Sequence, residues 1–203
     1  MGAAQSIISP KLVDRVKAIL MKPKTEWPVI EAEQTDISTI FRSYAIPLAA
    51  IGPVANAIGI ALIGTTTLAG TARVPILTAI VGAVIAFALA LLGTYVVAQV
   101  IDNLAPRYGG TRNLTQAFKV SAYSSTAQWL AGVFALIPAL SPLSILGLYS
   151  LYLLYLGLPV LMKVPQEKAM SYTVAVVVVA LIVLIVIATI SGIIIGGAAI
   201  ATL

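Results

Sequence analysis

Four stretches without a single charged residue dominate the pattern of hydrophobic and polar positions. They cover residues 43–72, 74–101, 120–162 and 169–203. A membrane-spanning helix needs about 20 apolar residues, so the first, second and fourth stretches each predict one span. The third is long enough for two, and Pro138 and Pro142 lie near its middle, where a tight hairpin would turn. The pattern therefore predicts an all-α polytopic membrane protein, one bundle of five transmembrane helices near residues 44–63, 75–101, 118–138, 142–161 and 172–196.

The residues before the first span follow a different pattern. Ser9-Pro10 is a favourable helix start, because a cap oxygen precedes proline at the first helical position. Apolar residues from Leu12 to Leu20 then recur on one helical face, and Lys22-Pro23 ends the run. We therefore divide the chain into a cytoplasmic N-terminal segment, residues 1–42, with a short amphipathic helix, and a five-span transmembrane domain, residues 43–203.

Two interpretations of this amphipathic helix stay open. It either lies in the membrane interface on anionic lipid, or packs on the cytoplasmic ends of the spans. A second helix is expected from Pro28 onward, with Trp27 as an interface anchor. Its carboxylates Glu31, Glu33 and Asp36 are expected to form a solvated face near the positive end of the helix dipole.

Composition and charge agree with a membrane protein and orient it. The chain is 60% hydrophobic and 9% charged, whereas a soluble domain carries about 25% charged residues. With the N-terminus inside, 11 of the 12 basic residues lie on the cytoplasmic side, and only Arg73 lies outside. The positive-inside rule thus predicts a cytoplasmic N-terminus and an external C-terminus. The net charge of +5 indicates contact with anionic lipid, not with nucleic acid.

Catalytic chemistry finds little support in the sequence. The chain has no cysteine and no histidine, which excludes thiolate nucleophiles, imidazole bases and Cys/His metal sites. Ser124 and Ser125 have no base that the sequence reveals. We therefore expect a protein that is not an enzyme and that has no catalytic residue, cofactor or metal ion.

Polar residues inside the third and fourth predicted spans are the first candidate site. Ser121, Ser124, Ser125 and Gln128 recur at i, i+3, i+4 and i+7, which is one helical face. Since the two spans form a hairpin, Tyr149 and Tyr152 would face this stripe. The six residues, called the polar cluster below, would either form hydrogen bonds between helices or line a polar cavity open to the cytoplasm.

A second set of candidates is charged and lies at the cytoplasmic ends of the spans. Asp102 either caps the chain after the second span or anchors the following loop by pairing with a nearby arginine. Gly109-Gly110 in that loop predicts a turn, and the small-residue pair Gly192 and Gly196 permits close helix contact within the bundle or between copies, so a homo-oligomer is considered. The expected loop or lipid contacts are Asp102, Arg107, Arg112, Lys11 and Arg15.

Several short stretches in this order resemble the Yip-domain family of Ypt/Rab-interacting membrane proteins, in its bacterial form. They are Lys-Thr-Glu-Trp-Pro at 24–28, Tyr-Ala-Ile-Pro-Leu at 44–48, Leu-Ala-Pro-Arg-Tyr-Gly-Gly at 104–110, Ala-Tyr-Ser at 122–124 with Trp129, Tyr-Ser-Leu-Tyr-Leu at 149–153, Gly-Leu-Pro at 157–159, Met162-Lys163 with Pro165, and Tyr172-Thr173. The resemblance implies a five-span bundle with a cytosolic N-terminus. It does not extend to Rab binding, because the Asp-Leu-Tyr-Gly-Pro motif of eukaryotic members has no counterpart here.

Two functions are compatible with these features. The first is a membrane scaffold or adaptor that binds lipids, with anionic head groups preferred, or an unknown protein partner at its cytoplasmic face. The alternative is a small-solute transporter or channel that uses the polar faces of spans three and four. The absence of any charge in the middle of a span argues against the second.

Overall fold

Helices make up almost all of the structure, a computed structural model that describes residues 12–67 and 70–200. Helices α1 (Leu12–Met21) and α2 (Pro23–Ala32) come first. A short antiparallel hairpin, β1 (Thr65–Thr67) and β2 (Gly70–Ala72), joins the first long helical segment to the second. The other elements are α3 (Ile37–Ile40), η1 (Phe41–Ala45), α4 (Ile46–Ala49), α5 (Ile51–Ile58), η2 (Gly59–Ile63), α6 (Ile76–Leu104), η3 (Ala105–Tyr108), α7 (Leu114–Ser124), α8 (Thr126–Ala131), η4 (Gly132–Leu136), η5 (Pro138–Leu148), α9 (Tyr149–Met162) and α10 (Gln166–Ile200).

Four helical segments among the described residues are long and apolar enough to cross a membrane. They are Ile37–Ile63, Ile76–Tyr108, Pro138–Met162 and Gln166–Val183. The prediction of a multi-pass, helical membrane protein is thereby confirmed in its general form. The four segments contain the predicted first, second and fourth spans and the start of the fifth, while the predicted third span, 118–138, is not one of them.

The third predicted span is helical but broken. It consists of α7, α8 and the 3₁₀ turn η4, and the α-helix is interrupted at Ser125. Hydroxyl groups explain the break: Ser125 Oγ donates to the carbonyl oxygen of Ser121 at 2.8 Å, and Thr126 Oγ1 to that of Tyr123 at 2.6 Å. Such bonds compete with the helical hydrogen bonds and bend the helix. The turn follows at Ile137, so the next segment begins at Pro138, earlier than the predicted residue 142.

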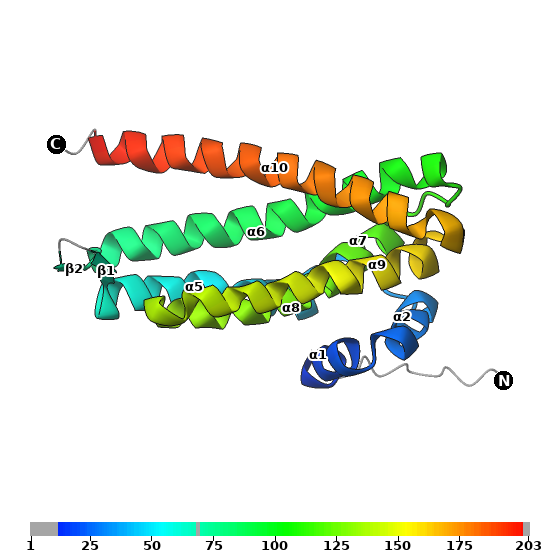
Figure 1. Cartoon of the computed structure of the whole chain (residues 1–203), viewed down its shortest axis with the longest axis horizontal. Helices are drawn as coiled ribbons and strands as arrows, with labels where there is room; N and C mark the ends of the chain where they lie inside the picture. The colour runs from blue at the N-terminus through cyan, green and yellow to red at the C-terminus, as the bar shows by residue number, and fades with distance from the viewer. Residues whose placement is uncertain (1–11, 68–69, 201–203) are drawn as a thin grey trace.

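The two ends of the bundle differ in what they carry (Figure 1). The β1–β2 hairpin lies at one end, and α10 runs toward it. Helices α1 and α2 lie beside α8 and α9 toward the other end, where the chain also turns from α6 through η3 into α7. We call these the hairpin end and the capped end.

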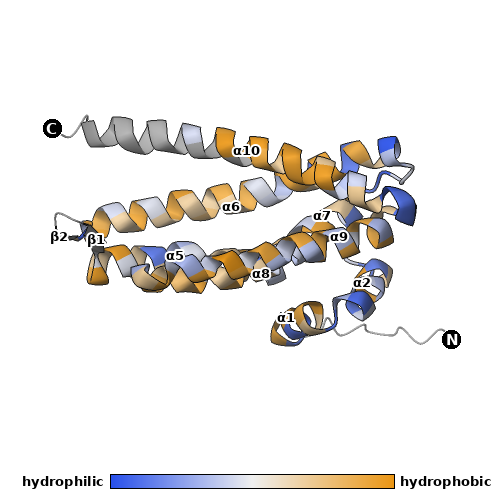
Figure 2. Cartoon of the chain, viewed as in Figure 1, coloured by the Kyte–Doolittle hydropathy of each residue, from blue (hydrophilic) through white to orange (hydrophobic). Residues whose placement is uncertain are grey.

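Burial is strongly uneven between the two ends. Fully buried residues such as Ile101, Phe118 and Leu158 gather at the capped end, whereas Ile76, Leu77 and Val84 near the hairpin expose more than half of their side chains. Figure 2 accordingly shows much of α6 and of the coloured part of α10 in orange, the colour of apolar residues. Exposed apolar helix surface of this extent suits hydrocarbon rather than water, so the hairpin half has the character of a lipid-embedded region.

The N-terminal segment packs against the bundle. Ile19, Trp27 and Ile30 are fully buried there. Helix α1 ends at Met21 as predicted, but α2 begins at Pro23 rather than at Pro28 and contains Pro28 in its interior. Proline at its first position suits a helix start, and the chain is extended at Glu33 before α3 begins at Ile37.

Candidate functional site

Four members of the polar cluster line one cavity. Ser121, Ser124, Ser125 and Gln128 face an open space of about 620 Å³ between α6, α7, α8, η5, α9 and α10. Ser144 and Ser150 add two hydroxyls to its wall, and Leu148, Val177 and Leu181 are among its apolar lining. We call it the serine cavity. A smaller space of about 270 Å³ lies on the other side of the same stripe, against α5 and α6, and shares Ser121, Ser125 and Gln128.

Most hydroxyl groups around the serine cavity are already engaged by the backbone. Ser121 Oγ donates to the carbonyl oxygen of Thr94 at 2.7 Å, and the hydroxyls of Ser124 and Ser125 donate to that of Ser121. Ser150 Oγ accepts from the backbone N–H of Gln128 at 3.0 Å. The Gln128 side chain, by contrast, is exposed and forms no hydrogen bond within the described residues. The cavity therefore offers one amide, acceptor oxygens and apolar walls, which suits neutral polar or amphipathic molecules.

Tyr149 and Tyr152 do not reach the serine cavity. Their rings lie 5.4 Å apart, and Tyr149 Oη donates to the carbonyl oxygen of Leu20 in α1 at 3.0 Å. Successive residues on an α-helix point about 100° apart, so the face that brings Ser150 to the cavity turns Tyr149 toward the N-terminal helices. The structure thus divides the predicted polar cluster between two places.

A buried charged network holds α1 and α2 to the bundle. Arg15 is only 3% exposed and forms ion pairs with Glu26 and Glu33 of the N-terminal segment, and its guanidinium carbon lies 5.7 Å from the ring centre of Tyr123 in α7. Since protein groups surround Arg15, it is not turned to lipid head groups. Lys119 Nζ, also buried, donates to the backbone oxygens of Ile30 at 2.8 Å and Glu33 at 2.7 Å. We call these groups the charged cap.

Two of the three carboxylates expected on a solvated face are in fact paired. Glu33 belongs to the charged cap, and Glu31 forms a 2.8 Å ion pair with Lys163 after α9. Asp36 remains exposed and accepts hydrogen bonds from the hydroxyls of Ser38 and Thr39, which together lower the pKa of Asp36 to about 2. The acidic residues thus connect elements of the capped end, which sequence periodicity did not indicate.

Asp102 anchors the loop after α6, as one interpretation proposed. Its carboxylate accepts from Nε of Arg112 at 3.0 Å and lies 2.9 Å from Nη2. Arg112 also donates to the side chain of Asn103 at 2.9 Å, whereas Arg107 is exposed to solvent. The positive φ of 79° at Gly109 suits the glycine turn predicted there. Lys11 lies outside the described residues.

Sequence reasoning missed two interactions at the capped end. One is the binding of Lys119 to the backbone of the N-terminal segment. The position of a lone lysine between the apolar residues Phe118 and Val120 could have indicated a buried cation. The other is the contact between Trp27 and Gly157: a Cβ atom at Gly157 would lie 2.7 Å from Cζ2 of Trp27. No sequence rule links a tryptophan to a glycine 130 positions away. Among the residues that the structure describes, no cluster of potential metal ligands occurs.

The fold and these sites define a multi-pass helical membrane protein with its N-terminal helices packed on the bundle. The Yip1 domain family matches residues 17–200, which is nearly the whole chain. The chain therefore belongs to the Yip1 domain family, and the resemblance noted in the sequence is confirmed. No curated protein and no solved structure matches it.

Proposed function

We propose that this Yip1-domain protein is a non-enzymatic membrane scaffold or adaptor whose capped end presents a fixed surface to lipids or protein partners. The charged cap is the observation that carries the proposal. Two buried cations, Arg15 and Lys119, connect α2 to α1 and to α7. An interaction surface on short helices loses less entropy on binding when the helices are already fixed. The exposed apolar residues Val13, Met21 and Val29 on these helices are available for contacts.

Catalysis has little support in the site. The hydroxyls of Ser124 and Ser125 donate to the same backbone oxygen, and neither has a side-chain base within hydrogen-bonding distance among the described residues. A serine nucleophile requires such a base. We therefore propose that the serine cavity binds or packs rather than reacts.

The proposed topology has five crossings of a bacterial inner membrane, with the capped end in the cytoplasm. The distribution of lysine and arginine supports this orientation. The broken segment α7–α8–η4 would add one crossing to the four long apolar segments, as the third in chain order. It contacts α5, α6, α9 and η5. Irregular backbone is tolerated at membrane depth where protein surrounds it, and these neighbours provide that cover.

Cysteine labelling tests the topology, because the natural chain contains no cysteine. Single cysteines at Arg73, Arg107, Ser141 and Glu167 replace exposed residues near the ends of successive long helical segments. A membrane-impermeant maleimide added to intact cells is expected to label positions 73 and 141 only, and positions 107 and 167 only after lysis. Protection of position 141 in intact cells would mean that α7–α8–η4 does not cross the membrane. Labelling of positions 107 and 167 but not of 73 and 141 in intact cells would mean that the orientation is reversed.

Cross-linking tests the scaffold itself. A photoreactive amino acid at Val29, which is 50% exposed at the capped end, is expected to capture a reproducible protein or lipid species in native membranes. The matched position is Val84 on α6, 62% exposed in the hairpin half, where only bulk lipid adducts are expected. Identical adducts at both positions would argue against a specific cytoplasmic surface.

The serine cavity favours a second candidate, a small-solute transporter. Gln128 lies between the two cavities and carries an amide without a partner in the described residues. If solutes pass there, Gln128→Leu is expected to abolish saturable flux in proteoliposomes, while Gln99→Leu, outside both cavities, retains it. Absence of flux across a solute panel, or a correctly inserted Gln128→Leu protein with full flux, counts against the transporter and favours the scaffold.

A further inference from the structure

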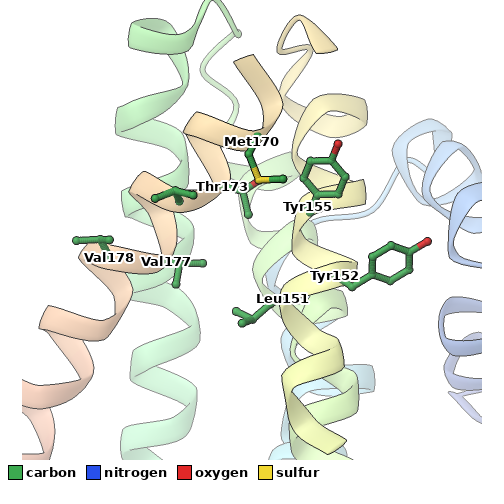
Figure 3. Close-up of a pocket in the computed structure, with 8 residues that line it drawn as sticks. Leu151, Tyr152, Tyr155, Met170, Thr173, Val177 and Val178 are labelled. Atoms are coloured by element: carbon green, nitrogen blue, oxygen red, sulfur yellow. The ribbon is translucent and has the colours of Figure 1, made fainter. Parts of the chain in front are cut away.

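A long apolar groove lies between α9 and α10 near the capped end. It has a volume of about 540 Å³ and is lined by Leu151, Tyr152, Tyr155, Met170, Thr173, Val174, Val177 and Val178. Figure 3 shows these side chains on two separate helices, with the phenol rings of Tyr152 and Tyr155 on the side of α9. Apart from the tyrosine hydroxyls and Thr173, the groove offers carbon and sulfur atoms only, which suits a hydrocarbon chain.

A basic pocket lies on the other side of Tyr152. It measures about 390 Å³ and is lined by the turn between α1 and α2, residues 21–25, together with Tyr149 and Tyr152. Tyr152 lines both spaces, and its hydroxyl points toward the N-terminal helices in Figure 3. The basic pocket and the apolar groove are therefore neighbours on the surface of α9.

The two lysines of the basic pocket are available for an anionic ligand. Lys22 and Lys24 are exposed, and neither takes part in an ion pair within the part of the chain that the structure describes. Arg15, Lys119, Arg112 and Lys163, in contrast, are already bound to carboxylate or backbone oxygens. The turn itself is held in place, because the carbonyl oxygen of Lys22 accepts from the hydroxyl of Thr25 at 3.0 Å.

We propose that these neighbouring spaces form a binding site for one anionic phospholipid. Its phosphate lies at Lys22 and Lys24, and one acyl chain occupies the α9–α10 groove. The combination of an apolar groove with two free cations on the other side of Tyr152 matches an amphipathic anion. The proposal rests on the scaffold function and specifies its lipid partner. A second copy of the chain or an apolar peptide would leave the two lysines without counter-charges.

Native mass spectrometry of the full chain in mild detergent tests the site. The protein is mixed with equal amounts of phosphatidylglycerol and phosphatidylcholine, and the retained lipid is counted. The wild type is expected to retain one phosphatidylglycerol in preference. Lys22→Gln/Lys24→Gln is expected to lower that retention roughly thirty-fold, because each lysine near an anionic surface contributes about 1 kcal/mol and every step of about 1.4 kcal/mol is tenfold in affinity. Val174→Trp fills the groove and is expected to reduce retention of both lipids.

Matched variants separate this site from general charge and surface effects. Lys17→Gln/Arg42→Gln removes the same charge from exposed positions outside the basic pocket, and Val84→Trp adds the same bulk to α6. Both are expected to behave as wild type. An equal loss in Lys17→Gln/Arg42→Gln, or unchanged retention in Lys22→Gln/Lys24→Gln, would overturn the proposal, as would displacement of the lipid by soluble glycerol phosphate. Lipid retention is measured without a protein partner, so its failure is distinct from failure of cross-linking at Val29.

Discussion

Replacement of Arg15 by methionine is expected to loosen α1 from α2 and to destabilise the capped end by about 3–5 kcal/mol. The guanidinium is 3% exposed and pairs with two carboxylates that are themselves 15% and 14% exposed. Methionine fills a similar volume but leaves Glu26 and Glu33 without their counter-charge. An uncompensated buried charge is far more costly than the loss of an exposed ion pair.

Thermal unfolding in detergent and limited trypsin digestion measure this effect. Arg15→Met is expected to unfold at a lower temperature and to be cleaved faster after Lys24 than the wild type. Lys17→Met, on the exposed face of the same helix, is the control and is expected to change neither. Adding Glu26→Gln and Glu33→Gln to Arg15→Met removes the unpaired charges and is expected to restore part of the stability. If Arg15→Met and Lys17→Met behave alike, the buried network does not hold the cap.

Helical periodicity predicted most of the buried face of α1 but not the burial of Arg15. Ile19 is fully buried, and Leu12, Val16 and Leu20 pack against the core. Arg15 was instead expected to be a loop or lipid contact. In the structure Arg15 and Ile19 are buried while Val13 is 58% exposed. The reason is that the partners of Arg15 lie 11 and 18 residues further along the chain. Patterns within one helix carry no information about a charge supplied by the next.

Span prediction succeeded where apolar length alone decides the structure. Helix α6 covers the predicted span 75–101 almost residue for residue, and α10 contains the predicted span 172–196. Span prediction was less accurate for residues 118–138. There the hydroxyls of Ser125 and Thr126 donate to carbonyl oxygens of the preceding helical turn and break the helix. Hydropathy counts those residues as mildly polar, but it does not record that their hydroxyls compete for backbone carbonyls.

The candidate site was predictable to the extent that one helix forms it. Spacing by three and four residues correctly grouped Ser121, Ser124, Ser125 and Gln128 on one cavity wall. The partner face across the hairpin depends on how α9 is rotated about its axis, which spacing within α7 and α8 cannot determine. Ser150, and not Tyr149 or Tyr152, faces the cavity.

Replacement of Trp27 by alanine is expected to destabilise the protein by about 3–5 kcal/mol, the usual range for removing a large aromatic side chain from a core. Trp27 is fully buried and its ring packs against Gly157 of α9. The indole N–H has no acceptor among the described residues, so the stabilisation comes from packing rather than from a hydrogen bond. Trp27→Phe is accordingly expected to lose much less stability than Trp27→Ala.

Gly157 tests the same contact from the opposite side. Gly157→Ala places a methyl group 2.7 Å from Cζ2 of the buried ring, closer than packed atoms allow, so α2 must move away from α9. Destabilisation is expected in the wild-type background and little further effect in Trp27→Ala, where space for the methyl group exists. Thermal unfolding of the four proteins gives the coupling between the two positions. Additive effects would contradict a direct contact between Trp27 and Gly157, and strong coupling would support it.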